Sequence, residues 1–351
     1  MTARSETPLF GLPGEPEHES VLLTCDIASG LKTIIAIHST ARGPAFGGCR
    51  LWHYDDDAAA MLDALRLSQG MSLKNALADL PFGGGKAVIV KPREPFDRRA
   101  LFCAFGDAVQ AAGGRYITAE DVGSSTDDMR LVQSRTPCVS GIPRDGAFGG
   151  DPSPKTAWGV FLAIQQALQQ HLKRPVSGST VALQGLGAVG MALAEYLADA
   201  GAKLLVADID AARTAQAVVH LGAQVAGVDE ILAMPCDVLA PCALGAVLNT
   251  DTVPLVRAAI ICGAANNQLA TPTDGDALAQ RGVLYMPDFL VNAGGIVSVA
   301  REYLGCGDET AVMHEVSRIA GRVAELLERS ASGASAPHRV AQAWAREKLR
   351  S

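Results

Sequence analysis

The segment TVALQGLGAVGMALAEYLADAG, residues 180–201, decides the fold of this chain. TVALQ is typical of a buried β-strand, the stretch Gly185–Gly190 has the spacing GxGxxG, and the residues after it are typical of a helix. A second strand-like run, KLLVA, leads directly to Asp208. A strand, a glycine turn, a helix, a second strand and an acidic residue in this order predict a Rossmann dinucleotide-binding unit.

Each residue of the glycine turn has a physical task in such a unit. Gly185 makes the tight turn, Gly187 lets the backbone approach a pyrophosphate, and Gly190 lets the helix pack closely on the strand. The helix starts at Ala188 and Val189, where unpaired N–H groups and the positive end of the helix dipole attract phosphate. The alternative is a glycine-rich turn in an ordinary α/β protein, and the surrounding strand, helix and acid argue against it.

Asp208 bears on the choice of cofactor. Its carboxylate can accept hydrogen bonds from the ribose hydroxyls of an adenosine, and it would repel a 2′-phosphate. The sequence therefore favours NAD over NADP. Arg213 lies close by in the sequence and weakens this preference.

The rest of the second half continues the alternation of strands and helices. Strand-like runs occur at residues 236–239, 258–262 and 283–286, with helix-like sequence between them. Such alternation predicts a parallel sheet covered by helices on both faces. The tail from 308 to 350 is typical of two helices, with a break at 330–337.

The first half predicts a separate α/β domain. Strand-like runs at 33–38, 86–91 and 115–118 accompany a helix-like run at 57–80. A chain of 351 residues exceeds the usual size of one hydrophobic core, so two domains are the natural expectation. The stretch 141–154, rich in Gly and Pro, is the candidate boundary.

We therefore expect a two-domain α/β protein. A substrate-binding, catalytic and oligomerisation domain would occupy residues 1–148 and take a C-terminal helix at about 331–351, and a Rossmann NAD-binding domain would occupy 149–330. A cleft would separate the two domains and close on substrate, with hinges near 141–154 and at the turn 292–295.

The composition argues against several classes of protein. A formal net charge of −7 argues against a basic nucleic-acid-binding face. The sequence has no run of ~18 apolar residues, and its first residues lack the apolar centre of a signal peptide, so no membrane span and no secretion are expected. The eight cysteines form no CxxC pair and the seven histidines are dispersed. We expect free thiols, a cytoplasmic location and no metal site.

Polar segments of the first half carry the candidate chemistry. They are GGCR at 47–50, Lys74 in the helix-like run, GGGK ending at Lys86, and TAEDVG at 118–123. The triple glycine before Lys86 is not a phosphate-binding P-loop, because the Walker spacing and the following Ser or Thr are missing. Taken singly, such lysines are most often solvated, and such an aspartate is most often a turn residue.

Taken together and in order, these segments resemble the amino-acid dehydrogenase family of leucine, valine, phenylalanine and glutamate dehydrogenases. The resemblance covers about Thr33 to Leu304. It implies the NAD-dependent oxidative deamination of an L-amino acid to a 2-oxo acid and ammonia, by a homo-oligomer. The similar segments are GPAFGGCR (43–50), SLKNALADLPFGGGK (72–86), TAEDVG (118–123), SPKTAWGV (153–160), QGLGAVG (184–190), PCALG (241–245), GAANNQ (263–268) and NAGGI (292–296).

Carried over residue by residue, the resemblance implies roles for these positions. Lys74 would bind the substrate α-carboxylate, Lys86 would be the catalytic lysine, and Asp121 would be its partner. The other substrate-binding candidates are Phe46, Gly47, Gly48, Met71, Ala119, Asn266, Ile296 and Val299, and the candidates beside the nicotinamide are Thr156, Cys242, Ala243 and Asn266.

The chemistry of oxidative deamination agrees with these roles. Hydride leaves Cα for the nicotinamide, water attacks the resulting iminium, and ammonia departs. The α-carboxylate needs a cation, which Lys74 supplies. A base near neutral pH is also needed, and burial beside a second lysine favours the neutral amine of Lys86. Asp121 can move protons to and from the substrate nitrogen, and as a carboxylate it favours a cationic amine or iminium.

Phe46 argues against glutamate as the substrate. The resemblance implies a lysine at this position in glutamate-specific enzymes, and a phenyl ring cannot pair with a side-chain carboxylate. Ala119, Ile296 and Val299 resemble the leucine and valine type. The bulk of Phe46 and Ile296 favours a short aliphatic substrate such as valine, norvaline or 2-aminobutyrate.

Two alternatives stay open at this point. An aromatic amino-acid dehydrogenase, for phenylalanine or tryptophan, would let a rotated Phe46 stack on the substrate. A non-catalytic sensor would bind NAD without turnover. Cys49 stands where the family commonly has threonine, and Ser298 stands where its leucine enzymes commonly have asparagine. The resemblance therefore does not fix the exact substrate.

Overall fold

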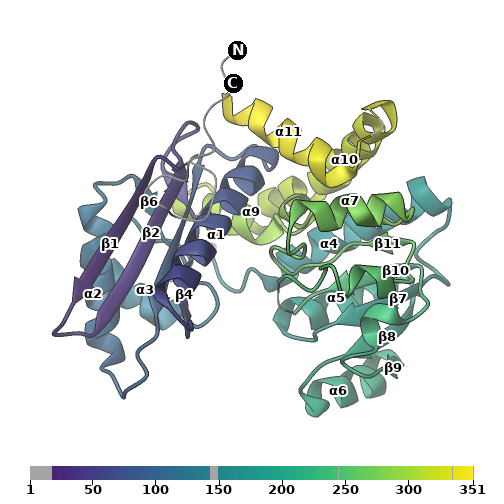
Figure 1. The fold of residues 1–351 in the computed structure, drawn as a ribbon, viewed down its shortest axis with the longest axis horizontal. Helices are drawn as coiled ribbons and strands as arrows, with labels where there is room; N and C mark the ends of the chain where they lie inside the picture. The colour runs from purple at the N-terminus through teal and green to yellow at the C-terminus, as the bar shows by residue number, and fades with distance from the viewer. Residues whose placement is uncertain (1–17, 143–148, 244, 334, 351) are drawn as a thin grey trace. The chain divides into compact units, whose positions relative to one another are not determined.

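The computed structural model describes residues 18–142, 149–243, 245–333 and 335–350. The chain forms two compact units (Figure 1). The first unit comprises residues 1–150, 299–307 and 345–351, and the second comprises 151–298 and 308–344. The stretch expected as a hinge, 141–154, falls partly outside the described residues, which do not include 143–148.

The first unit takes two late segments of the chain, 299–307 and 345–351, whereas the sequence predicts one, at about 331–351. Helices α9 (Gly294–Tyr303) and α11 (Pro337–Arg350) supply most of these residues. The domain boundaries given above stay a prediction.

A mixed six-stranded sheet forms the centre of the first unit. Its order is β1-β2-β5-β3-β6, and β4 pairs with β5. The pairs β1–β2 and β2–β5 are antiparallel, whereas β3 and β4 run parallel to β5 and β6 runs parallel to β3. The elements are β1 (Ser20–Asp26), β2 (Leu31–Ser39), β3 (Ala45–Phe46), β4 (Cys49–Trp52), β5 (Gly83–Val90), β6 (Tyr116–Ile117), α1 (Asp57–Leu77), α2 (Arg98–Ala111) and α3 (Thr126–Gln133).

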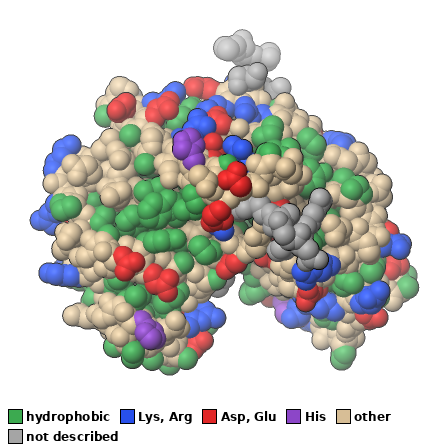
Figure 2. Space-filling model, turned by 180° about the vertical axis from the view of Figure 1, so that it is seen from behind, with side chains coloured by type: hydrophobic (Ala, Val, Ile, Leu, Met, Phe, Trp, Pro, Cys, Tyr) green, Lys and Arg blue, Asp and Glu red, His purple; other side chains and the backbone are tan. Residues whose placement is uncertain are grey.

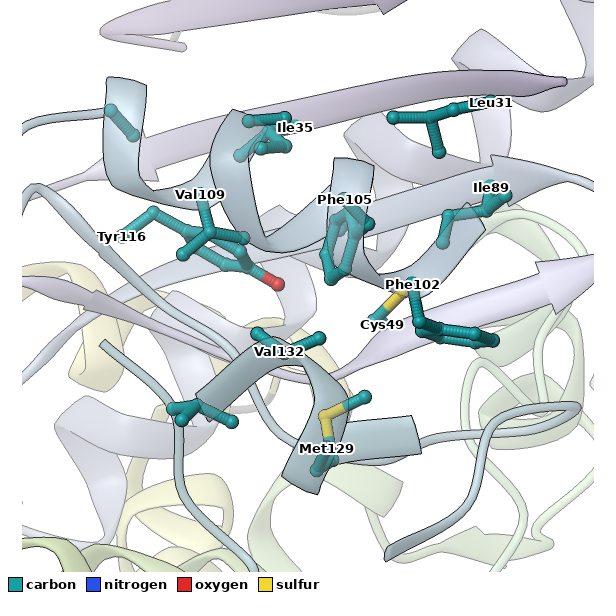
Figure 3. Close-up of a cluster of buried hydrophobic side chains, with 14 of the residues drawn as sticks. Leu31, Ile35, Cys49, Ile89, Phe102, Phe105, Val109, Tyr116, Met129 and Val132 are labelled. Carbon is teal, nitrogen blue, oxygen red and sulfur yellow. The ribbon is translucent and has the colours of Figure 1, made fainter. Parts of the chain in front are cut away.

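Helices cover both faces of this sheet. Ala87 and Ile89 of β5 belong to a buried cluster with α2 and α3, which Figure 3 shows around Phe102, Phe105 and Val132. Val88, between them, packs instead in a cluster with α1. Side chains alternate along a strand, so every second residue of β5 faces α1. Lys86, two residues before Val88, therefore lies on the α1 face.

The second unit has a parallel six-stranded sheet of order β12-β11-β10-β7-β8-β9. Counted along the chain this is the 3-2-1-4-5-6 order of dinucleotide-binding sheets, read from the other edge. Its elements are β7 (Thr180–Gln184), β8 (Lys203–Ala207), β9 (Gln224–Val225), β10 (Val238–Pro241), β11 (Ile260–Ile261), β12 (Leu284–Tyr285), α4 (Ser153–Ala167), α5 (Ala188–Asp199), α6 (Ala211–Leu221), α7 (Pro272–Gln280), α8 (Asp288–Val291) and α10 (Glu309–Gly333), with a π-helical turn at Leu168–Leu172 and 3-10 turns at Ile231–Ala233 and Val253–Leu255.

The expected two-domain α/β fold is confirmed, and several elements differ in detail. The helix expected at 57–80 ends at Leu77, and the strand expected at 258–262 is reduced to two residues. Strands β1, β3 and β4 and helices α2 and α3 were not predicted from the sequence. The strands β3 and β4 lie in the glycine-rich GPAFGGCRLW, where runs of two and four residues are too short to show a period.

The surface of the described residues is mixed in charge. Figure 2 shows acidic and basic side chains interspersed over the face it displays. Within the described part of the chain, no helix is long and apolar enough to cross a membrane.

Candidate active site

The geometry brings Lys86 and Asp121 together in the first unit. Lys86 Nζ lies 3.0 Å from Asp121 Oδ2, and only 6% of the lysine side chain and 15% of the aspartate side chain are exposed. Lys86 comes from the middle of β5, and Asp121 follows β6 in the loop 118–123. A buried lysine and carboxylate in direct contact form the kind of pair that proton-transfer chemistry requires.

Arg50 joins this pair. Its Nε lies 3.2 Å from the same Oδ2 of Asp121. Burial by itself raises the pKa of the Asp121 carboxyl, but the charges of Lys86 and Arg50 outweigh burial and lower this pKa to about 2. Asp121 is therefore a carboxylate at neutral and alkaline pH. Arg50 ends the segment GGCR, and the sequence pattern predicted no role for it.

The loop of Asp121 is pinned to strand β4 by its backbone. Ser124 Oγ accepts from the Asp121 N–H at 2.9 Å and donates to the Cys49 carbonyl at 2.8 Å. The Leu51 N–H donates to the Val122 carbonyl at 3.0 Å. The loop and the strand that carries Arg50 are thus held in one register.

Tyr116 holds the paired glycines Gly47 and Gly48 through hydrogen bonds to their carbonyls. Its hydroxyl donates toward the carbonyls of Gly47, at 2.8 Å, and Gly48, at 3.1 Å, and the side chain is fully buried. A Cβ on Gly47 would lie 1.9 Å from the Gly85 carbonyl, and one on Gly48 would lie 2.6 Å from the Glu120 carbonyl. Packing against these carbonyls therefore leaves room only for glycine at either position. Tyr116 escaped the sequence analysis because an isolated tyrosine in a short strand carries no motif.

Helix α1 places Lys74 beside β5, the strand that carries Lys86. Its neighbours Met71, Leu73 and Asn75 are buried, and Lys74 itself is only partly exposed. Asn75 Nδ2 donates to the Gly83 carbonyl at 2.6 Å and to the Phe46 carbonyl at 3.2 Å. These bonds tie the helix that carries Lys74 to the strands before Lys86.

An aromatic cluster surrounds the position expected to read the substrate side chain. Phe46 is fully buried, with its ring centroid 4.8 Å from that of Phe82 and 5.9 Å from that of Tyr303. Packing on two rings opposes the rotation by which Phe46 would stack on a substrate. Ala119 is nearly buried, and Val299 falls in the first unit, where its carbonyl accepts from Ser140 Oγ at 2.9 Å.

A cavity of about 760 Å³, lined in part by Ser140, Ile142 and Tyr303, meets this aromatic cluster through Tyr303.

The Cys49 thiol points away from the sheet face of Lys86, into the buried cluster beside Phe102 and Phe105 (Figure 3). Burial raises the pKa of this thiol well above its usual value. The departure from threonine at this position therefore changes core packing.

The glycine turn of the second unit has the shape that a dinucleotide requires. Gly185 has φ +96°, which favours glycine, and a Cβ there would lie 2.8 Å from the Ala243 Cβ. A Cβ on Gly190 would lie 2.1 Å from the Gly185 carbonyl, so the helix packs directly on the turn. At Gly187 the nearest atom to such a Cβ is Arg213 Nη1 at 3.9 Å. The space above the first residues of α5, Ala188 and Val189, is therefore open to a pyrophosphate.

Asp208 accepts hydrogen bonds from the backbone of two loops, the glycine turn after β7 and its own loop after β8. Its side chain is 6% exposed and accepts from the Leu186 N–H at 2.6 Å and from the Asp210 N–H at 2.8 Å. Asp210, about half exposed, caps α6 through the Ala212 N–H and lies 3.3 Å from Arg213 Nε. Arg213 Nη1 is also 3.8 Å from Asp208. Two acids thus face one arginine, and Asp210 was not among the residues predicted from the sequence.

The other candidates of the second unit lie in the loops after β10 and β11 and at two helix starts. Asn292, 4% exposed, donates from Nδ2 to Asn266 Oδ1 at 3.0 Å and to the Ala264 carbonyl at 3.0 Å. Asn292 therefore orients the Asn266 carboxamide. Cys242 and Ala243 follow β10, Thr156 lies in the first turn of α4 with Oγ1 3.1 Å from the Pro152 carbonyl, and Ile296 lies in α9.

Comparison with known proteins agrees with this geometry. Residues 20–137 match the Glu/Leu/Phe/Val dehydrogenase dimerisation domain, and residues 151–216 and 206–320 match the Glutamate/Leucine/Phenylalanine/Valine dehydrogenase domain. A leucine dehydrogenase of Bacillus subtilis (strain 168) is 41% identical over 342 residues, 97% of this chain and 94% of that protein. A valine dehydrogenase of Streptomyces albus is 44% identical over 292 residues, 82% and 80% of the two chains. The crystal structure of L-tryptophan dehydrogenase from Nostoc punctiforme is similar at TM-score 0.80 and 37% identity, over 95% of this chain and 96% of that one.

Proposed function

The chain belongs to the Glu/Leu/Phe/Val dehydrogenase family, and on that premise we propose that it catalyses the reversible, NAD-dependent oxidative deamination of an aliphatic L-amino acid to the 2-oxo acid and ammonia. It is an amino-acid dehydrogenase, which removes the alternative of a non-catalytic sensor. The observation that carries the proposed chemistry is the buried contact between Lys86 and Asp121.

The residues of the first unit account for the proton-transfer steps. A nicotinamide cofactor held by the second unit would supply the hydride acceptor for the substrate Cα. Lys74 holds the α-carboxylate, Lys86 takes a proton from the water that attacks the iminium, and the Lys86 cation then stabilises the carbinolamine oxygen. Asp121, with a pKa of about 2, starts as a carboxylate. It takes a proton from the substrate ammonium group, stabilises the cationic iminium, and returns that proton to the carbinolamine nitrogen so that ammonia can leave.

The glycine turn and its acids support NAD as the cofactor. Gly187, Ala188 and Val189 would hold the pyrophosphate, and Asp208 stands at the end of β8, where the ribose is bound in such folds. Arg213 is paired with Asp208 and Asp210, so its charge is compensated and attracts a 2′-phosphate less.

The packing of Phe46 supports an aliphatic substrate. Its ring is fixed by Phe82 and Tyr303 and offers no partner for a side-chain carboxylate. The L-tryptophan dehydrogenase from Nostoc punctiforme keeps an aromatic substrate as the second candidate. A larger residue in place of Ala119, which is 6% exposed, should lower kcat/KM most for large substrates.

Assembly and location complete the proposal. The match of residues 20–137 to a domain described as a dimerisation domain supports a homo-oligomer. All eight cysteines are free thiols, as proteins of the reducing cytoplasm usually have them, which supports a cytoplasmic location.

The test is NADH formation at alkaline pH with NAD and a panel of L-amino acids: valine, leucine, 2-aminobutyrate, phenylalanine, tryptophan and glutamate. We expect valine, leucine or 2-aminobutyrate to give the highest kcat/KM. A lead by phenylalanine or tryptophan would keep the reaction and overturn the reading of Phe46. Lys86→Ala should lower kcat by at least a factor of about 100, the usual contribution of a general base. Unchanged turnover in that variant would overturn the mechanism.

A further inference from the structure

Arg50 shares one oxygen of Asp121 with the catalytic lysine. Lys86 Nζ and Arg50 Nε lie 3.0 and 3.2 Å from Asp121 Oδ2, so the two nitrogens are roughly 6 Å apart at most. A guanidinium stays charged at every working pH. Arg50 therefore places a permanent positive charge beside Lys86 and also fixes which oxygen of Asp121 faces it.

Arg50 is itself held from its other side. Its Nη1 lies 2.9 Å from Asp63 Oδ2, and the Tyr54 hydroxyl donates to the same oxygen at 2.5 Å. The side chains of Arg50 and Asp63 are 19% and 25% exposed. Asp63 belongs to α1, the helix that carries Lys74. A chain of contacts, Tyr54–Asp63–Arg50–Asp121–Lys86, thus connects α1, through Asp63, to the proposed catalytic lysine.

We propose that Arg50, oriented by Asp63 and Tyr54, is a positioning residue for the deamination. It clamps Oδ2 of Asp121 against Lys86, leaves Oδ1 to face the substrate nitrogen, and sets the local charge at which Lys86 works as a base. This inference rests on the roles proposed above for Lys86 and Asp121.

The charges along this chain of contacts determine the direction in which each substitution should shift the pH profile. Two cations, Lys86 and Arg50, face two anions, Asp121 and Asp63, in a site with little solvent. A neighbouring cation makes it easier for the base to lose its proton, and a neighbouring anion makes it harder. Charges about 6 Å apart in a protein shift such an equilibrium by about one pH unit or more.

The experiment compares the pH dependence of kcat/KM in three variants, using the best amino acid of the panel. In Arg50→Gln the acid limb should move up by about one pH unit, because a cation is lost. In Asp63→Asn it should move down by a smaller amount, because an anion is lost. In Arg50→Lys the acid limb should stay within a few tenths of a pH unit of the wild type, because the positive charge is kept. The kcat should fall roughly tenfold, because lysine cannot contact Asp63 and Asp121 at the same time as the guanidinium does.

Arg130→Gln is the matched control, since Arg130 makes an exposed ion pair with Asp127 on α3 of the same unit. It should leave the profile unchanged. Cooperative thermal unfolding and NADH fluorescence show that each variant is folded and binds cofactor. If Arg50→Gln does not fold, the opposite shift in Asp63→Asn and the fixed limb in Arg50→Lys still decide the matter.

Acid limbs that coincide in all folded variants would overturn the inference while leaving the function intact, provided that the wild type turns over an amino acid and Lys86→Ala does not. A wild type without turnover, or an active Lys86→Ala, would instead overturn the proposed function and the inference with it.

Discussion

Shared charged residues occur at two places in this protein, beside Lys86 and at the end of β8. At the first site Asp121 is shared by two cations. At the second, one cation, Arg213, is shared by two acids, Asp208 and Asp210. We propose that this compensation of the Arg213 charge weakens its attraction for the 2′-phosphate of NADP.

Asp210→Asn tests that compensation. Asparagine keeps the cap on the Ala212 N–H but loses the charge that faces Arg213 at 3.3 Å. We expect the ratio of kcat/KM with NADP to that with NAD to rise roughly three- to tenfold, the range that a partly exposed ion pair supports. Asp229→Asn, at an exposed acid of the same unit, should leave the ratio unchanged. An unaltered ratio in Asp210→Asn would mean that Arg213 does not face the ribose.

At the scale of elements, the contact between α1 and β5 positions the lysines. The helix carries Lys74 and the strand carries Lys86, and the glycines before Lys86 let the two approach. A Cβ on Gly84 would lie 2.0 Å from the Ser72 backbone nitrogen and 2.3 Å from its Oγ. Since the nearest atom is helix backbone, α1 itself would have to move.

Gly84→Ala should therefore lower both stability and substrate affinity. We expect a loss of about 1–3 kcal/mol in the free energy of unfolding, as for other overpacked cores, and a tenfold or larger rise in the amino-acid KM. Urea unfolding and steady-state kinetics measure the two effects. Gly321→Ala is the control, because a Cβ there, in α10, meets nothing within 4 Å and alanine favours the helix. A Gly84→Ala enzyme with normal KM would show that α1 does not set the position of Lys74.

The scale of elements also shows how far the sequence reaches. The strand, turn and helix of residues 180–201 follow from local pattern, because these elements are neighbours along the chain. The pairing of β10 with β7 joins strands that are not consecutive, so the order of the sheet does not follow from local pattern. Asp63 and Asp121 meet through Arg50 only after the sheet has formed, and no spacing in the sequence reports that contact. Strand β3 could not be predicted because two residues show no period, and Tyr116 could not because a single tyrosine carries no motif.

Stability as a whole should depend on pH through a buried histidine. His38 of β2 is 7% exposed, with Nδ1 2.7 Å from Ser72 Oγ of α1. Burial, with the charges of His18 and Arg346, lowers its pKa from 6.5 to about 4. The unfolded chain binds this proton more readily than the folded one. The stabilisation is therefore complete above pH 6.5 and is lost as pH falls from there toward 4.

We expect the wild type to lose about 3 kcal/mol of stability over that interval from this group. Urea unfolding between pH 7 and pH 4 measures the slope. His38→Gln should be less stable at pH 7 and should show a shallower decline toward acid. His53→Gln, at an exposed histidine, should follow the wild-type slope. Equal slopes in wild type and His38→Gln would rule out this histidine as the source.

The contribution of residues 345–351 to the first unit has a consequence for biosynthesis. Arg42 donates to the Lys348 carbonyl at 2.8 Å, and Lys348 pairs with Asp79 in the turn between Lys74 and Lys86. On the ribosome the whole second unit is made after residue 150 and before these partners exist. At 5–20 residues per second that delay is roughly 10–40 s. During it the nascent first unit lacks part of its own structure, and the second unit, although later in the chain, can be the first to finish folding.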